Sequence, residues 1–496
     1  MSGGYDAANQ GEIMQKPIGL ICALVFAVSA AVNVQASTLD QLVRAYAEQR
    51  NFSGVVLVAR DGQPIYQAAF GMAQPQWKVA VTDDSVFRIG SLSKPLTATL
   101  IMRLAEIGRI NLDETVGTYL PAAYAGTGAG KITVRQLLSH TSGLADLPSR
   151  YTDPFWSRDA RRHYTPKEFA SEWIPGVLAS EPGTWRYNNN GYYLLGMIVE
   201  AATGKSYAEN MKQYIFAPAG MQDSGVFDGR TIIAKLAQGT VQADDGTRVL
   251  PSYIDPSVSY SAAGLYATAL DLVRFDAALA GGRLLNQTSQ REMFANRGKG
   301  YGYGWEVEDW AVRKDTPLPV VLHTGSVPGY QSIFVRSLSD HVAIVILDNA
   351  WQGATVVAMA RDIADLVHGK PVALPRRSLQ AALSPILFRE GLDAMRAAYI
   401  RLGARESTTY DVSESALNAF GYSLLRKNQP EAAIEVFRWN AEAYPLSHNV
   451  HDSLAEALLA SGDREGARAG YAKVLALDPG NRHAAEELEK LRHTNP

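Results

Sequence analysis

Residues 87–94 read Phe-Arg-Ile-Gly-Ser-Leu-Ser-Lys, and an apolar pattern with helical spacing follows them. Ser91 and Lys94 stand three positions apart, so at the start of a helix their side chains share one face and lie within mutual reach. A lysine whose pKa is lowered can take the proton of a serine hydroxyl, and the helix N-terminus stabilises an anion that forms beside that serine. The pair therefore indicates a nucleophile and its base. The alternative, a helix-capping serine followed by a surface lysine, gives the same spacing.

Four further motifs make the pattern specific. They are Ile132 to Leu144, which contains Ser139-His140-Thr141-Ser142-Gly143, then Tyr187-Asn188-Asn189, Ala263-Gly264-Leu265 and His323-Thr324-Gly325. In this order the motifs resemble those of the serine β-lactamase and penicillin-binding protein superfamily, in particular its class C-like branch, which also contains D-stereospecific peptidases and esterases. The resemblance covers residues 41–368. It implies an α+β fold of the β-lactamase/transpeptidase type, with an antiparallel sheet flanked by helices and an inserted helical lobe.

The resemblance implies a catalytic role for three residues. Ser91 would be the nucleophile that accepts the acyl group, and Lys94 would be its base partner. Tyr187 would carry protons between Ser91, the leaving group and the attacking water. Asn189 would hold the substrate amide and position Lys94. His140, by the same resemblance, belongs to a scaffold turn and has no direct chemical role.

The third motif would bind the substrate. By the resemblance, His323, Thr324 and Gly325 form a strand edge along which the substrate backbone lies, and the glycine permits that close approach. The backbone N–H groups of Ser91 and Ser326 would form the oxyanion hole.

His323 departs from the usual pattern, because a lysine is usual here in β-lactamases and penicillin-binding proteins. Lysine offers a permanent cation to a substrate carboxylate, whereas a histidine with a pKa near 6.5 is mostly neutral at pH 7. We therefore expect substrates without a free C-terminal carboxylate. A β-lactamase would need another cation, for which the arginines in the loop at 147–164 are candidates.

Three functions are compatible with these residues. The first is a secreted serine hydrolase that forms an acyl-enzyme on Ser91 and acts on a D-amino-acid peptide, amide or ester. The second is a class C-like β-lactamase or a penicillin-binding D,D-carboxypeptidase. The third is a non-catalytic envelope protein that binds a partner through its C-terminal helices. The presence of Ser91, Lys94 and Tyr187 together favours the enzymes.

Apolar stretches at both ends of residues 37–370 predict one antiparallel sheet. Residues 53–59 and 64–71 flank Asp61-Gly62, which is a strong hairpin signal. Three further strands are predicted at 320–324, 331–335 and 342–347. The helical patterns between these strands predict a lobe inserted into the sheet domain.

The chain beyond residue 370 differs in composition and in its predicted secondary structure. A linker rich in proline and basic residues is expected at 371–386, and a helical domain is expected at 387–496, beginning with a helix at 387–402.

Similar residues recur 34 positions apart in this tail, for example Ala433 with Ala467 and Pro445 with Pro479. This period resembles the tetratricopeptide helix-turn-helix repeat. We expect repeats at 414–447 and 448–481. They would either bind a protein partner or brace the 37–370 domain.

Residues 1–36 have the pattern of a secretory signal. An uncharged apolar run at 18–32 contains the single cysteine, Cys22, and Val34-Gln35-Ala36 follows as a cleavage pattern. The run is short for a transmembrane helix, which needs about 20 residues. We expect cleavage and a periplasmic or extracellular protein, membrane-anchored only if the signal is retained, with Met14 as a candidate start.

The composition excludes several other classes of function. The 496 residues include 47 Lys and Arg against 50 Asp and Glu, so the net charge of -3 gives no reason to expect a nucleic-acid partner. A single cysteine cannot build a thiolate zinc site, and no H-E-x-x-H or calcium-loop pattern occurs. We therefore expect no metal and no cofactor, only a small peptide, amide or ester substrate.

Overall fold

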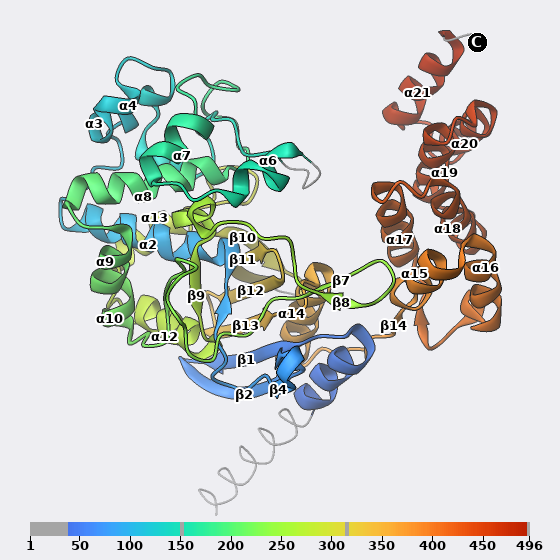
Figure 1. Cartoon of the computed structure of the whole chain (residues 1–496), viewed down its shortest axis with the longest axis horizontal. Helices are drawn as coiled ribbons and strands as arrows, with labels where there is room; N and C mark the ends of the chain where they lie inside the picture. The colour runs from blue at the N-terminus through green and yellow to red at the C-terminus, as the bar shows by residue number, and fades with distance from the viewer. Residues whose placement is uncertain (1–37, 149–152, 313–316, 494–496) are drawn as a thin grey trace, which may run out of the picture.

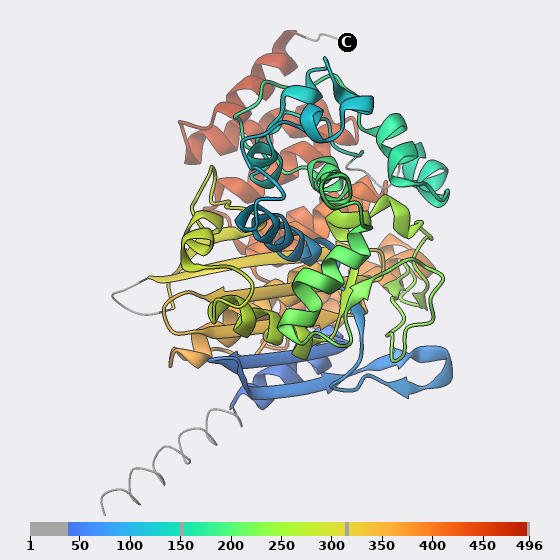
Figure 2. The same cartoon turned by 90° about the vertical axis from the view of Figure 1, so that its left-hand side faces the viewer.

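The computed structural model describes residues 38–148, 153–312 and 317–493. The predicted signal at 1–36 lies outside the described residues. Figure 1 shows a body of sheet and helices with a helical tail beside it, and Figure 2 shows the same parts from the side. Within the described ranges, no helix is both long enough and apolar enough to cross a membrane.

A six-stranded antiparallel sheet lies at the centre of the body. In spatial order its strands are β10 (Glu306–Trp310), β11 (Leu318–Val327), β12 (Tyr330–Ser337), β13 (Val342–Asp348), β1 (Gly54–Arg60) and β2 (Gln63–Phe70). Strand β1 pairs with β13, so that Val56 lies opposite Ile346. The predicted hairpin turn at Asp61-Gly62 joins β1 to β2. One sheet is thus built from both ends of the body, as the sequence predicts.

Strand β1 shows why these segments are so apolar. Val55 and Leu57 belong to one hydrophobic core and Val56 and Val58 to another, because successive side chains of a strand point to opposite faces of the sheet. Both faces are covered by helices. On one face, a helix over residues 38–50 and α14 (Gly353–Val367) supply the covering side chains.

The other face packs against the inserted helical lobe. The helices of the lobe are α2 (Ser93–Glu106), α3 (Val116–Tyr119), α4 (Pro121–Tyr124), α5 (Val134–Leu138), α6 (Pro154–Ser157), α7 (Pro166–Trp173), α8 (Asn189–Thr203), α9 (Tyr207–Met211), α10 (Ala217–Ala219), α11 (Tyr260–Ala263), α12 (Ala269–Ala280) and α13 (Gln287–Met293). Helix α2 is almost wholly buried, with Leu96, Leu100 and Leu104 in the larger core. The lobe therefore shares its core with the sheet.

Short strands hold the connections. They are β3 (Met72–Gln74), β4 (Val79–Ala80), β5 (Phe87–Arg88), β6 (Gly225–Val226), β7 (Val241–Gln242), β8 (Arg248–Val249), β9 (Leu265–Ala267), β14 (Arg377–Ser378) and β15 (Tyr410–Asp411). A three-stranded sheet with the order β5-β9-β6 fixes the segment that leads into Ser91.

The tail consists of helices, but its beginning differs from the prediction. Its helices are α15 (Leu379–Glu390), α16 (Leu392–Arg401), α17 (Glu414–Arg426), α18 (Pro430–Ala443), α19 (His448–Ala460), α20 (Arg464–Leu477) and α21 (Arg482–His493). The side chain of Ser378 caps α15 inside the expected linker, and Gly391, with a φ of 91°, separates α15 from α16. A single helix at 387–402 was therefore wrong. The prolines and basic residues at 371–377 suggested the linker, yet α15 begins at Leu379 within its expected bounds, and this helix contains Pro385.

The two predicted repeats correspond to two consecutive helical hairpins. Helices α19 and α20 begin and end 34 residues after α17 and α18, respectively. The small residue Gly421 on α17 packs against the ring of Phe437 on α18, which leaves no room for a side chain. The spacing agrees with the predicted repeat length, and membership in the tetratricopeptide family stays a prediction.

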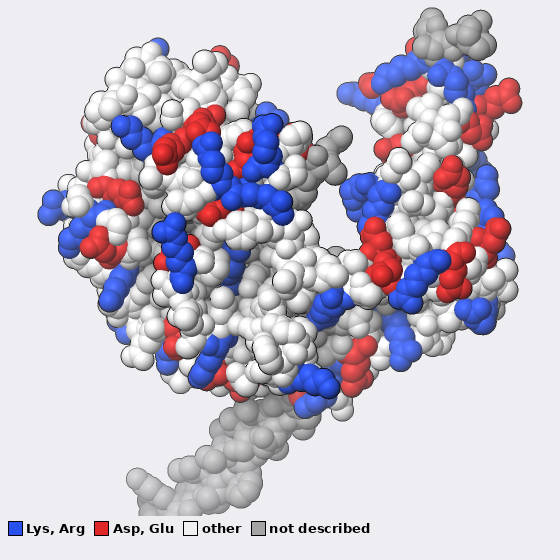
Figure 3. Space-filling view, viewed as in Figure 1, with Lys and Arg blue, Asp and Glu red and all other residues white. Residues whose placement is uncertain are grey.

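The tail contacts the body at one end. Lys427 pairs with Asp244, and Arg389 donates to the backbone carbonyl of Asp245, both in the β7–β8 hairpin that Figure 1 shows reaching α15. Arg50 also forms an ion pair with Asp411. On the face shown in Figure 3, open space separates the upper tail from the lobe, and positive and negative side chains are interspersed.

Candidate active site

Ser91 lies in a short turn that leads into α2. The 3-10 turn Gly90–Leu92 precedes the helix, so Ser91 stands at its N-terminal end, where backbone N–H groups favour an anion. The neighbouring Ser93 is buried, and its hydroxyl donates to the carbonyl of Gly90 and accepts from the N–H of Leu265. Of the two serines, Ser91 is the one that lines a cavity.

The side chain of Lys94 is completely buried. Its Nζ lies 3.1 Å from Oγ of Ser91, 2.9 Å from Oδ1 of Asn189 and 3.1 Å from the carbonyl oxygen of Ala262. Burial lowers the pKa of Lys94 to about 7, so a large share of the amine is neutral at neutral pH. A neutral amine has two N–H donors and one lone pair. Asn189 and Ala262 offer only acceptors, so they take both hydrogens and leave the lone pair for the Ser91 hydroxyl.

Tyr187 lies beside both Ser91 and Lys94. The centre of its ring is 4.7 Å from Nζ of Lys94. Burial raises the pKa of Tyr187, and a hydrogen bond with Ser91 only partly opposes this. The phenol is therefore protonated at neutral pH, and it can pass on a proton only in exchange for another.

Asp146 fixes Asn189, and sequence reasoning missed it. The two carboxylate oxygens of Asp146 accept from the backbone N–H of Asn189 at 2.9 Å and from its side-chain Nδ2 at 3.2 Å. The amide is thereby held with Oδ1 toward Lys94. Asp146 follows the motif that ends at Leu144 by two residues, and no spacing rule marks it.

His323 is buried and neutral. Its Nδ1 lies 2.6 Å from the carbonyl oxygen of Thr324, so this nitrogen carries the proton, and its Nε2 accepts from the hydroxyl of Tyr301 at 3.0 Å. Burial and the charge of Lys94 lower the pKa of His323 to about 3. The position that usually holds a lysine therefore carries no positive charge.

Strand β11 approaches the Ser91 turn so closely that only glycine fits. A Cβ on Gly325 would lie 2.0 Å from the carbonyl oxygen of Ile89, and a Cβ on Gly90 would lie 2.6 Å from the backbone N of Ser326. The hydroxyl of Ser332 on β12 also donates to the Ile89 carbonyl at 2.8 Å. These contacts bring the N–H groups of the turn and of β11 to one place.

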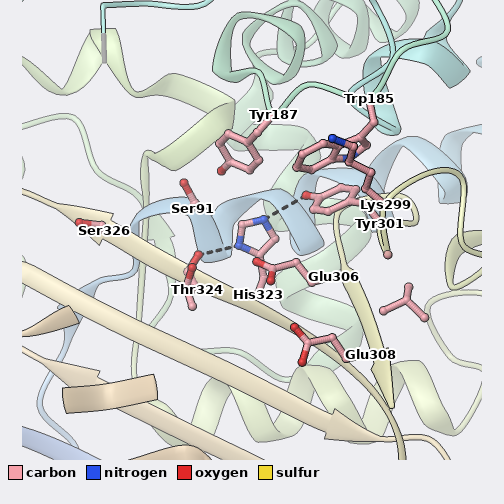
Figure 4. Close-up of a pocket in the computed structure, with 12 residues that line it drawn as sticks. Ser91, Trp185, Tyr187, Lys299, Tyr301, Glu306, Glu308, His323, Thr324 and Ser326 are labelled. Carbon is pink, nitrogen blue, oxygen red and sulfur yellow. Dashed lines mark hydrogen bonds between the residues drawn. The ribbon is translucent and has the colours of Figure 1, made fainter. Parts of the chain in front are cut away.

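A cavity of about 480 Å³ opens beside Ser91 (Figure 4). It is lined by Ser91, Trp185, Tyr187, Lys299, Gly300, Tyr301, Glu306, Val307, Glu308, His323, Thr324 and Ser326. The structure thus brings together every predicted site residue. Lys94 is hydrogen-bonded to Ser91 and to Asn189, and Gly325 packs against the turn that carries Ser91. The walls formed by Trp185, Tyr301 and the two glutamates were not predicted.

Comparison with known proteins assigns this arrangement to a family. The Beta-lactamase family model matches residues 39–385. The chain belongs to this family. The family comprises serine hydrolases, including esterases, amidases and peptidases, so the resemblance carried by the motifs is confirmed.

Three relatives show the range of the family. A penicillin-binding protein of Bacillus subtilis (strain 168) is 30% identical over 362 residues, covering 68% of this chain and 77% of that protein. Esterase EstB of Burkholderia gladioli is 28% identical over 369 residues, covering 66% of this chain and 92% of the esterase. The crystal structure of D-amino acid amidase from Ochrobactrum anthropi SV3 with D-phenylalanine is 26% identical with a TM-score of 0.54, covering 68% of this chain and 98% of that chain.

In this β-lactamase family member, His140 has structural contacts. Its φ is 58°, and its Nδ1 accepts from the backbone N–H of Asn188 at 3.1 Å. Its ring packs 4.5 Å from that of Tyr187 and 4.7 Å from that of Tyr301, centre to centre. His140 therefore supports the aromatic wall from behind.

The loop arginines do not supply a cation to the cavity within the described residues. Arg158 pairs with Asp159 and Arg162 pairs with Glu172, and neither arginine lines the cavity. Among the described residues that line the cavity, Lys299 is the one with a cationic side chain, and this side chain is exposed at the mouth.

We expect Gly325→Ala to damage both stability and activity. The added methyl must displace the Ile89 carbonyl, which costs about 1–3 kcal/mol of unfolding free energy, and it shifts Ser91, which lowers kcat/KM by about 100-fold or more. Urea unfolding and ester hydrolysis measure the two effects. Gly480→Ala, where a Cβ meets nothing closer than 3.5 Å, serves as the control. Wild-type activity in Gly325→Ala would show that this contact does not position Ser91.

Proposed function

We propose that this chain is a serine hydrolase that forms an acyl-enzyme on Ser91 and acts on D-amino-acid amides or peptides, or on esters. The observation that carries this proposal is the buried Lys94, whose two acceptor partners leave its lone pair to the Ser91 hydroxyl 3.1 Å away. A non-catalytic protein has no need to bury a lysine in this way, because burial of an amine costs stability.

In the proposed reaction, neutral Lys94 takes the proton of Ser91 as Oγ bonds to the substrate carbonyl carbon. The backbone N–H groups of Ser91 and Ser326 stabilise the oxyanion. The leaving group departs with a proton from Tyr187, and Tyr187 is reprotonated from Lys94. Water then attacks the acyl group, and its proton returns along the same path to Ser91, so the enzyme ends in its starting state.

The neutral site at His323 supports the choice of substrate. Without a lysine at this position, a substrate carboxylate finds no positive charge on the described strand β11. Relatives named as an esterase and as a D-amino acid amidase fit this choice. A penicillin-binding activity is the second candidate, favoured by the relative of that name in Bacillus subtilis. It would depend on Lys299 as the cation.

We further propose export through residues 1–36, a hydrolase domain at 37–370 and a separate helical tail. The apolar run in the sequence supports the export signal. The tail carries a groove of about 770 Å³, lined in part by Asn418, Tyr422 and Asn449, which supports a role in binding a protein partner. Its ion pair to the body through Lys427 supports the alternative role as a brace.

A labelling experiment tests the proposed chemistry. Wild-type protein should gain the mass of one fluorophosphonate adduct, and Ser91→Ala should gain none, because the phosphonate reacts only with an activated serine. A fluorescent penicillin should label the wild type weakly or not at all. Absence of both adducts on the folded wild type would contradict a serine hydrolase, and rapid labelling by penicillin would favour the second candidate.

The pKa of Lys94 predicts a pH profile. Because the neutral amine is the base, kcat/KM for an uncharged ester such as p-nitrophenyl butyrate should rise through a pKa of about 7 and fall about tenfold per pH unit below it. Lys94→Arg, which stays charged, should lose more than about 100-fold. A profile that is flat from about pH 5 to 9 would exclude Lys94 as the base.

A further inference from the structure

Glu306 stands at a corner of the catalytic cavity. It is the first residue of β10 and lies opposite Leu322 of β11. Strand β11 continues for five residues, 323–327, beyond this last pair, and among the described residues no strand pairs with that stretch on the β10 side. A substrate that lies along this open edge would therefore end beside Glu306.

The carboxylate of Glu306 has no partner in the described part of the chain. Neighbouring Glu308 accepts from Nε1 of Trp310 at 2.7 Å and pairs with Arg361 at 3.0 Å. Glu306 is also part-buried, yet its side chain makes no hydrogen bond or ion pair with another described residue. Burial and the charge of Glu308 raise the pKa of Glu306 to about 7, although Arg361 lowers it slightly. Such a carboxylate is stabilised by any cation that enters the cavity.

The groups facing Glu306 do not supply that cation. His323 is neutral, and Tyr187 and Tyr301 are protonated phenols whose pKa values are raised further by the charge of Glu306. Lys299 lines the cavity, but it is exposed at the mouth and forms no ion pair with Glu306. Figure 4 shows Glu306 between His323 and Glu308, on the side of the cavity away from Ser326.

We propose that Glu306 is a specificity-determining residue that binds a positively charged group of the substrate. The enzyme then prefers esters or amides that carry an ammonium group at the His323 end of the cavity. This inference rests on the proposed function, because it assumes that the acyl group is transferred to Ser91. It reverses the charge preference of a site built around a lysine at position 323.

The spacing fits such a substrate. Four strand positions separate Ser326, beside the reacting carbonyl, from Leu322, which lies opposite Glu306. At 3.3 Å per residue this is about 13 Å, a span that a short ammonium-bearing alcohol and the glutamate side chain fill together. The half-buried ring of Trp185 adds an aromatic wall, which also favours a cation.

Three thioesters of butyrate test the inference. They carry choline, its uncharged carbon analogue 3,3-dimethylbutyl, or an anionic carboxyethyl group on sulfur, and thiol release gives kcat/KM for each. Wild-type protein should prefer the choline thioester over the uncharged one by about 10-fold or more, since a hydrogen-bonded or paired charge contributes on this scale. The anionic thioester should be the poorest.

Glu306→Gln should lower kcat/KM for the choline thioester by about 10-fold, leave the uncharged one within about 3-fold and raise the anionic one. Glu308→Gln is the matched control and should change the preference less, because its charge is already paired. A variant with a damaged active site would lose activity on all three thioesters together. A lower kcat/KM for the choline thioester with a higher kcat/KM for the anionic thioester identifies charge recognition.

The outcomes separate the two proposals. If Ser91 is labelled by the fluorophosphonate but the wild type shows no preference for choline thioester, or Glu306→Gln changes all three substrates equally, the role of Glu306 is wrong and the proposed hydrolase stands. If the wild type neither hydrolyses a thioester nor takes the phosphonate, the proposed function fails, and the inference fails with it.

Discussion

The close packing of the Ser91 turn against strand β11 is the contact on which the active site depends. Gly325 lies so near the Ile89 carbonyl that a methyl group could not be accommodated, and a Cβ on Gly90 would likewise clash with the backbone N of Ser326. More than 200 residues separate these two segments in the chain. The six-stranded sheet brings them together, because its central strand β13 pairs with the N-terminal strand β1 on one side and with β12 on the other.

This packing also determines the chemistry of Lys94. The helix that follows the Ser91 turn is almost wholly buried in the core that the lobe shares with the sheet, so the amine loses contact with water and its pKa falls. Besides Ser91, the amine keeps two hydrogen-bond acceptors, Oδ1 of Asn189 and the carbonyl of Ala262. These two accept both hydrogens of a neutral amine, whereas an ammonium would need Ser91 as a third acceptor. Asp146 acts one step further away by holding the amide of Asn189 in this orientation.

The parts predicted from sequence were those that short local patterns encode. The central sheet is predictable because β1 and β13 are apolar runs between clear turns, and Ser91, Lys94, Tyr187 and His323 each lie in a motif with characteristic neighbours. Asp146 and Glu306 were missed because each is an isolated acid that the tertiary fold alone brings to the site, Asp146 through its hydrogen bonds to Asn189 and Glu306 on the cavity wall. The start of α15 was missed for a local reason, since the prolines and basic residues at 371–377 suggested a linker that would extend to 386, whereas α15 begins at Leu379.

The titration of Lys94 itself shows most directly whether this residue can act as the base. In protein labelled with ¹³C at the lysine ε-carbon, the signal that disappears in Lys94→Arg belongs to Lys94, and its chemical shift against pH reports the charge of the amine. We expect a midpoint near pH 7, because burial lowers the pKa of the amine. A midpoint close to the ordinary lysine value of about 10.4 would show that the amine is charged at neutral pH and would contradict its role as the base.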